Sequence, residues 1–136
     1  MIKKRILATT MIALGITIGT GSAMIVSADN HTDTSWSNEY RVWSPNDATP
    51  SRNKTNRTSY YNKTTSTDIG YHTIWAALQD GTDASSGHSY KSYQGDETFL
   101  WNNAVENHGS GVSVRINSRS WNNGYAKGVW SPDSVR

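Results

Sequence analysis

The side chains that most often carry catalysis or bind metal ions are present in this chain but scattered along it. Its four histidines, His31, His72, His88 and His108, show neither a His-x-His nor a His-Glu-x-x-His spacing. Glu106 and His108 are two residues apart, so on a strand they would share a face and could hold a metal ion at the surface. Solvated polar residues at a turn are the simpler explanation.

The carboxylates and serines give no catalytic pattern either. Asp96 and Glu97 are adjacent, so on a strand they would point to opposite faces and could not flank one scissile bond. Asp80 and Asp83 share a loop with a glycine, but the ligand spacing and terminal glutamate of a calcium-binding EF-hand are absent. No Gly-x-Ser-x-Gly elbow occurs. We therefore predict a protein that is not an enzyme and uses no cofactor or metal ion.

Aromatic residues are the stronger signal. The chain has 6 Trp, 7 Tyr and 1 Phe, all after residue 29, and a domain of this size cannot bury all of them. Exposed rings flanked by amide and hydroxyl groups suit sugar rings or a protein surface. Trp43, Trp75, Trp101 and Trp130 are assigned to the core. Trp36 and Trp121, in polar surroundings, are expected to be exposed, and together with Tyr125 they are the candidate binding residues.

The N-terminal residues 1–28 have the three parts of a secretory signal peptide. Met1–Arg5 is basic, an apolar run without charge follows, and Val26-Ser27-Ala28 offers small residues to the signal peptidase. Cleavage is expected between Ala28 and Asp29, which predicts a secreted, extracellular protein. The alternative, a retained membrane anchor, is weakened by three glycines in the apolar run. Only an uncleaved leader would attach the chain to a membrane.

Charge and cysteine content limit the possible partners. Removal of 28 from 136 residues leaves 108, enough for one domain. Three of the 13 basic residues lie in the leader, so 10 remain against 11 acidic residues, a net charge of −1. Nucleic acid is therefore not expected as a partner. No cysteine occurs, and a cysteine-free exported chain is typical of Gram-positive bacteria.

The elements that must position these residues are predicted to be short strands. Leucine is scarce, whereas aromatic residues, Thr, Ser, Asn and Gly are abundant, which favours an all-β fold. Six or seven strands with regular turn signals are typical of a small antiparallel β-sandwich, with a small β-barrel as the alternative. Residues 29–38 are predicted to form a flexible N-terminus and residues 39–136 the β-sandwich domain.

Local patterns suggest individual strands. Residues 112–130 are predicted to form a β-hairpin around Asn122-Asn123-Gly124, because apolar residues alternate before this turn signal and β-forming residues follow it. The tetrapeptide Val-Trp-Ser-Pro occurs at 42–45 and 129–132, which we interpret as the same strand end used twice. Residues 69–79 fit either a strand or a helix. A helix over 98–107, ended by Gly109, is the alternative to strand there.

Several short motifs also occur in a particular order. They are Ala28-Asp29-Asn30 with Asp33–Ser37, a Tyr-rich strand at Arg57–Lys63, an apolar stretch with Trp75 and Leu78, Val112-x-Val114-x-Ile116, and Tyr125-x-x-Gly128-x-Trp130. This order resembles a family of small secreted proteins of Gram-positive bacteria, mainly bacilli, classified as a domain of unknown function. The resemblance implies export and a compact β domain and supplies no activity. A weaker resemblance is to bacteriocins of the lactococcin type.

Two functions follow as hypotheses. The first is a secreted, non-enzymatic protein that binds an extracellular or cell-envelope ligand, either a glycan or a protein. The second is a bacteriocin-like secreted antimicrobial protein.

Overall fold

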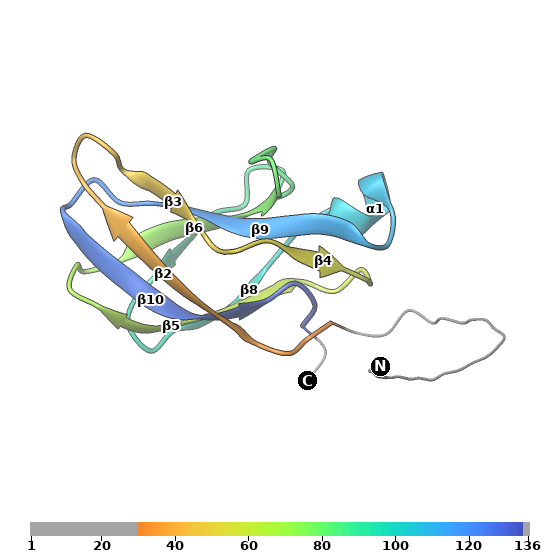
Figure 1. Ribbon diagram of the computed structural model, residues 1–136, viewed down its shortest axis with the longest axis horizontal. Coiled ribbons are helices and arrows are strands. Elements are labelled where there is room, and N and C mark those ends of the chain that lie inside the picture. Colours follow the sequence, from red (N-terminus) through yellow and green to blue (C-terminus); the bar gives the residue numbers. More distant parts are fainter. Residues whose placement is uncertain (1–29, 135–136) are drawn as a thin grey trace, which may run out of the picture.

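The computed structural model describes residues 30–134, which form two antiparallel β-sheets packed face to face (Figure 1). The prediction of a β-sandwich is confirmed, and the two sheets do not close into a barrel. The predicted signal peptide and its cleavage site at Ala28 and Asp29 lie outside the described residues. Within residues 30–134 no helix is long and apolar enough to cross a bilayer.

The four-stranded sheet has the order β2-β10-β5-β8, and the other sheet has the order β3-β9-β6-β7, with β4 also paired to β9. The elements are β2 (Thr34–Tyr40), β3 (Asn46–Ala48), β4 (Arg52–Lys54), β5 (Tyr60–Thr67), β6 (His72–Leu78), β7 (Tyr90–Ser92), β8 (Glu97–Leu100), α1 (Ala104–His108), β9 (Val112–Arg119) and β10 (Gly124–Ser131). The turns after β2 and β9 lie at the left end of Figure 1, and β4 and α1 lie at the right end.

Strand β2 corrects the expectation of a flexible segment over residues 29–38. It pairs with β10 along its length, with Trp36 opposite Gly128. Trp36, Asn38 and Tyr40 point inward and are buried, whereas the residues between them are exposed. The alternation of a strand is present in the sequence, but it is hard to recognise. Only two of the three inward residues are aromatic, and the third, Asn38, is as polar as the outward residues beside it.

The predicted hairpin over residues 112–130 is wrong, because β9 and β10 belong to different sheets. β9 pairs with β3, β4 and β6, and β10 pairs with β2 and β5. Asn123, expected to close a hairpin, instead accepts a hydrogen bond from the backbone N–H of Val42 through its side-chain oxygen, at 2.9 Å. The turn therefore carries the chain from one sheet to the other.

The two ambiguous segments are resolved differently. Residues 72–78 are strand β6, paired with both β7 and β9. Between residues 98 and 107 the chain is first strand β8 and then α1, which ends at Gly109 with a φ of 88°. The repeated tetrapeptide does not have one structure: Trp130 is buried in β10, whereas Trp43 lies in the turn after β2 and is 78% exposed.

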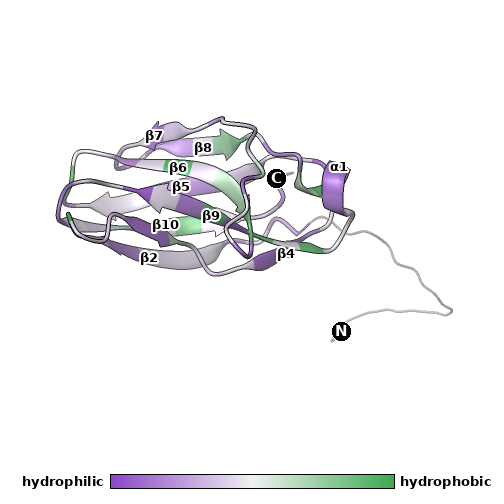
Figure 2. Cartoon of the chain, turned by 90° about the horizontal axis from the view of Figure 1, so that it is seen from above, coloured by the Kyte–Doolittle hydropathy of each residue, from purple (hydrophilic) through white to green (hydrophobic). Residues whose placement is uncertain are grey.

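Aromatic rings form much of the core. The rings of Tyr60 and Trp130 lie 6.0 Å apart and those of Trp36 and His72 lie 5.5 Å apart, in tilted arrangements. Strongly hydrophobic residues occupy only short parts of the strands, as on β6, β8 and β9 (Figure 2). The core therefore depends on rings and on buried polar contacts between the sheets.

Candidate functional site

A buried network of polar side chains joins the two sheets around His72. Its Nδ1 lies 2.9 Å from the Tyr40 hydroxyl and its Nε2 lies 3.0 Å from Thr64 Oγ1. The Tyr40 hydroxyl also lies 2.7 Å from Ser118 Oγ. Burial lowers the pKa of His72 to about 4. Since His72 is 1% exposed, a substrate cannot reach it, and we assign the network to the core.

A second buried polar group surrounds Asp133. Its carboxylate accepts hydrogen bonds from Lys54 Nζ at 3.0 Å, from Thr55 Oγ1 at 2.6 Å and from the backbone N–H of Asn30 at 2.7 Å. Burial raises the pKa of Asp133, but these hydrogen bonds and the Lys54 charge outweigh it and hold the pKa below its ordinary value. The group ties the two ends of the described chain to β4 and is a structural element.

The other acidic residues do not assemble a metal site. In the part of the chain that the structure describes, no group of three or more His, Asp or Glu could hold a metal ion. Glu106 and His108 lie in α1 and not on a strand, so residues two apart there do not share a face. Asp80 and Asp83 accept hydrogen bonds from the backbone N–H groups of residues two positions later, as in ordinary polar turns.

The structure sorts the tryptophans differently from the sequence-based assignment. Trp130 is buried as expected, but Trp43 and Trp101 are 78% and 43% exposed, and Trp75 is half-buried. Trp121 is 65% exposed, as expected. Trp36 was expected to be exposed but is only 4% exposed. It occupies an inward position on β2, a segment that was not recognised as a strand from the sequence.

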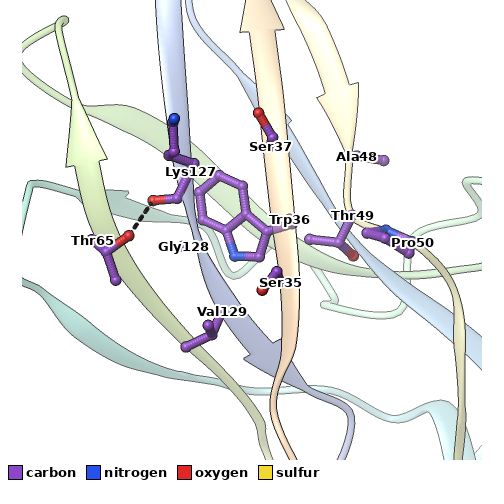
Figure 3. A pocket seen from close by; sticks show the side chains of 10 residues that line it. All are labelled: Ser35, Trp36, Ser37, Ala48, Thr49, Pro50, Thr65, Lys127, Gly128 and Val129. Carbon is purple, nitrogen blue, oxygen red and sulfur yellow. Dashed lines mark hydrogen bonds between the residues drawn. The ribbon is translucent and has the colours of Figure 1, made fainter.

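Trp36 lies beside a cavity of about 670 Å³ at the edge of the sandwich, between β2 and the β3–β4 strand edge. Figure 3 shows its indole extending from β2 across Gly128 of β10, and the ring belongs to the buried core cluster. The rest of the lining is mainly small and polar, including Ser35, Ser37 and Thr49. A ligand in this cavity would meet hydroxyl groups but little of the aromatic ring, so Trp36 is a weak candidate for sugar stacking.

Tyr125 lies on β10, which belongs to the four-stranded sheet, and is half-buried. Its hydroxyl lies 3.0 Å from Ser66 Oγ, and the Lys127 ammonium lies 5.4 Å from its ring centre. Trp121 lies instead in the connection that follows β9. The three predicted binding residues are thus distributed over an interior edge, a connection and an outer sheet face, and do not form one site.

A different set of residues surrounds Arg119 on the outer face of the sheet that contains β9. The Arg119 guanidinium lies 5.4 Å from the ring centre of Trp75 and 5.9 Å from that of Trp121. Both distances are in the range of cation–π contacts. We call this surface the Arg119 face, defined by Tyr71, Thr73, Trp75, Lys91, Asn117, Arg119 and Trp121.

Strand pairing places these residues together. Thr73 of β6 is opposite Lys91 of β7 on one side and opposite Arg119 of β9 on the other. Trp75 is opposite Asn117. Because paired residues of neighbouring strands point to the same face of a sheet, all five side chains point outward.

Two hollows lie beside Arg119. One, of about 220 Å³, is lined by Tyr71, Thr73, Arg119, Ser120, Trp121 and Asn122. The other, of about 450 Å³, includes Asn46, Trp75, Arg115 and Asn117 in its lining. Flat rings with amide, hydroxyl and cationic groups at their edges can stack on a sugar ring and bond its hydroxyls.

The sequence indicated part of this face. The alternation of residues 112–117 already placed Asn117, which belongs to the face, and its neighbour Arg115 on the polar side of a strand. It gave no indication that Trp75 and Lys91 would join them, because that depends on the pairing of β6 with β9 and β7.

These features define a β-sandwich in which the outer face of the sheet containing β9 carries aromatic and basic side chains. The chain matches, over residues 24–134, the family described as protein of unknown function (DUF2712), and it belongs to that family. The expectation of a family classified only as a domain of unknown function is confirmed. No curated protein and no solved structure shows significant similarity to the chain.

Proposed function

We propose that this protein is exported and binds a glycan of the cell envelope on the Arg119 face, without catalysis. The observation that carries the proposal is the pair of rings that both lie within cation–π distance of Arg119: Trp121, which is 65% exposed, and Trp75, which is half-buried. Amide and hydroxyl groups of Asn117 and Thr73 border the rings. This combination suits a sugar ring better than an apolar protein surface.

Binding without catalysis is supported by where the titratable groups lie. His72 and Asp133 are the residues with the most elaborate hydrogen-bonded surroundings, and both are buried and satisfied. The Arg119 face presents cations and rings, with neither an acid–base pair nor a nucleophile next to a base among its defining residues. Such a surface can bind and orient a ligand.

The test is a glycan array together with sedimentation of envelope preparations. The purified domain is expected to bind at least one envelope glycan, and a Trp75→Ala/Trp121→Ala double variant is expected to lose this binding. Trp101→Ala is the matched control, since Trp101 is also exposed but is not one of the residues that define the Arg119 face, and its ring stacks on His88 with the ring centres 4.8 Å apart. Binding to no glycan would remove the proposal, and capture of an envelope protein instead would replace it.

Export is supported by the leader and by a fold that needs no disulfide bond, since the chain contains no cysteine. Fractionation of the producing cells and N-terminal sequencing test it. The protein is expected in the medium with Asp29 as its first residue. Recovery only from the cytoplasm would contradict export.

A second candidate function is that of an exported antimicrobial protein. The observation in its favour is the turn after β2, where Val42 and Trp43 are 57% and 78% exposed. Apolar and indole side chains at a protruding turn suit the interface of a lipid bilayer. The purified protein is then expected to inhibit the growth of related bacteria, and Trp43→Ala is expected to abolish inhibition. No inhibition at any dose would exclude this function.

A further inference from the structure

We infer that the ligand of the Arg119 face is an acidic polysaccharide, whose carboxylate or phosphate groups are held by Arg119 and Lys91. The inference rests on the proposed function and specifies its ligand. Three observations carry it: the position of the Arg119 guanidinium, the pairing of Lys91 with the same row of residues, and the lack of an ion pair at either cation within residues 30–134.

The Arg119 guanidinium is positioned with only part of its bonding capacity used. Its Nε donates to Asn46 Oδ1 at 3.0 Å, and the guanidinium lies within cation–π distance of the rings of Trp75 and Trp121. Rings can attract a guanidinium but cannot neutralise its charge. Arg119 lines the hollow that Trp121 also lines, and the planar fork of a guanidinium is suited to a carboxylate or phosphate.

Lys91 supplies a second cation in the same row. Thr73 lies between Lys91 and Arg119, because it is opposite Lys91 on β7 and opposite Arg119 on β9. Two strand spacings place their backbones about 10 Å apart. The Lys91 ammonium lies 4.8 Å from the ring centre of Tyr71, so each cation has an aromatic ring beside it. A cation next to an aromatic ring therefore occurs twice along the row. An acidic polysaccharide likewise repeats an anionic group next to a sugar ring, so the two repeats can match.

No carboxylate of the described residues forms an ion pair with Arg119 or Lys91. Among residues 30–134, ion pairs join Arg41 to Glu39 and Lys54 to Asp133, and neither Arg119 nor Lys91 has one. The carboxylates of Asp47, Asp68 and Asp96 accept hydrogen bonds from the backbone N–H groups of Glu39, Tyr125 and Tyr93, respectively.

The cations on this face are also not a consequence of a basic chain. Residues 29–136 contain 10 basic and 11 acidic residues. A pair of cations without ion pairs in the described part of the chain is therefore a local feature, and it attracts an anion locally.

The experiment compares ligands that differ only in charge. Polygalacturonate and its fully methyl-esterified form share one sugar backbone, and poly(glycerol phosphate) tests phosphate in place of carboxylate. Affinities are measured by calorimetry at two salt concentrations. The wild-type protein is expected to bind at least one of the two anionic polymers about tenfold or more tightly than the methyl ester, with binding weakened by salt.

Variants then assign the effect to named residues. Arg119→Gln and Lys91→Gln are each expected to reduce the affinity for the anionic polymer about tenfold or more, while thermal unfolding stays unchanged. Lys127→Gln is the matched control, because Lys127 is also exposed and also lies over a tyrosine ring, at 5.4 Å, but on the four-stranded sheet. An equal loss in this control would overturn the assignment.

The outcomes separate this inference from the proposed function. Equal binding of the charged and esterified polymers by the Arg119 face would overturn the acidic ligand and leave glycan binding intact. Equal binding of polyglutamate and the anionic polysaccharides would show that charge alone suffices, which would also overturn it. Binding to no glycan of any kind would remove the proposed function itself.

Discussion

Lys54 and Asp133 form an ion pair of 3.0 Å although the side chains of both are completely buried. The two residues are 79 positions apart. Lys54 Nζ also donates to the carbonyl oxygen of Pro132 at 2.7 Å, and the Asp133 carboxylate receives further backbone and hydroxyl hydrogen bonds. A buried charge is tolerated only with such partners, since removing one partner leaves the other charged and unsolvated.

Lys54→Met is therefore expected to lower the free energy of unfolding by about 3–5 kcal/mol. Urea denaturation followed by tryptophan fluorescence measures it. Lys127→Met, at an exposed position of β10, is the control and is expected to change stability by no more than about 0.5 kcal/mol. A loss below about 1 kcal/mol for Lys54→Met would mean that the buried pair contributes nothing.

Asp133 also makes stability sensitive to acid. Its pKa in the folded protein is below the ordinary value, so its contribution is present above the pKa of the unfolded chain, about 4. As the pH falls through the lower folded pKa, the contribution is lost. Asp133→Asn is expected to be less stable than the wild type at about pH 7, with the difference decreasing toward about pH 2. Thermal unfolding across that range measures it, and a constant difference would contradict the assignment.

His72 titrates in a higher window. Its folded pKa of about 4 lies below the ordinary value of 6.5, so the unfolded chain binds a proton between these pH values and the folded protein does not. Stability is therefore expected to fall between about pH 6.5 and about pH 4, by on the order of 3 kcal/mol. His72→Gln should remove this pH dependence, whereas His108→Gln, at an exposed position of α1, should retain it. The same slope in both variants would refute the prediction.

Gly128 is required by the close approach of β10 to β5. A Cβ atom at this position would lie 2.0 Å from the carbonyl oxygen of Lys63, a backbone atom of the neighbouring strand. Gly128→Ala is therefore expected to cost at least about 2 kcal/mol. Gly70→Ala is the control, since a Cβ atom added there would have nothing within 4 Å. Comparable melting temperatures for the two variants would show that the strands can move apart.

The two Val-Trp-Ser-Pro segments give a sharp comparison. Trp130 is completely buried and packs on Tyr60, whereas Trp43 is 78% exposed. Trp130→Ala is expected to lower the free energy of unfolding by about 3–5 kcal/mol, and Trp43→Ala to change it by no more than about 0.5 kcal/mol. Denaturant unfolding of both variants measures it. A large loss for Trp43→Ala would mean that this turn holds the sheets together.

The fold class was predictable because composition reports it: few leucines and many aromatic and β-branched residues exclude a helical bundle. The connection of β9 to β10 was not predictable from local signals. Asn122-Asn123-Gly124 would permit a hairpin, yet the chain passes to the other sheet. Each of the two strands has a row of buried side chains, and these rows face each other across the core between the sheets. Turn chemistry specifies a change of direction but not the sheet in which the next strand pairs.

The same distinction applies to the candidate site. Trp121 was recognised as exposed because its neighbours are polar, a property that the local sequence shows directly. Arg119 was missed because its significance comes from Trp75, a residue 44 positions earlier that only strand pairing brings near. Trp36 was wrongly predicted to be exposed for a related reason. The inward side chains of a strand can include an asparagine when another strand provides its hydrogen-bond partners, and the local sequence does not show those partners.

The order in which the strands occupy the sheets has a consequence for biosynthesis. β9 and β10 are the last two of the described strands, yet each is an inner strand, and β2, β3 and β4 have no other strand partner among the described residues. On the ribosome, a nascent chain that has not released these final residues can assemble only the β5–β8 and β6–β7 pairs. Completion of the two sheets must therefore wait until β9 and β10 have left the ribosome, and until then the sheets cannot close over a common core.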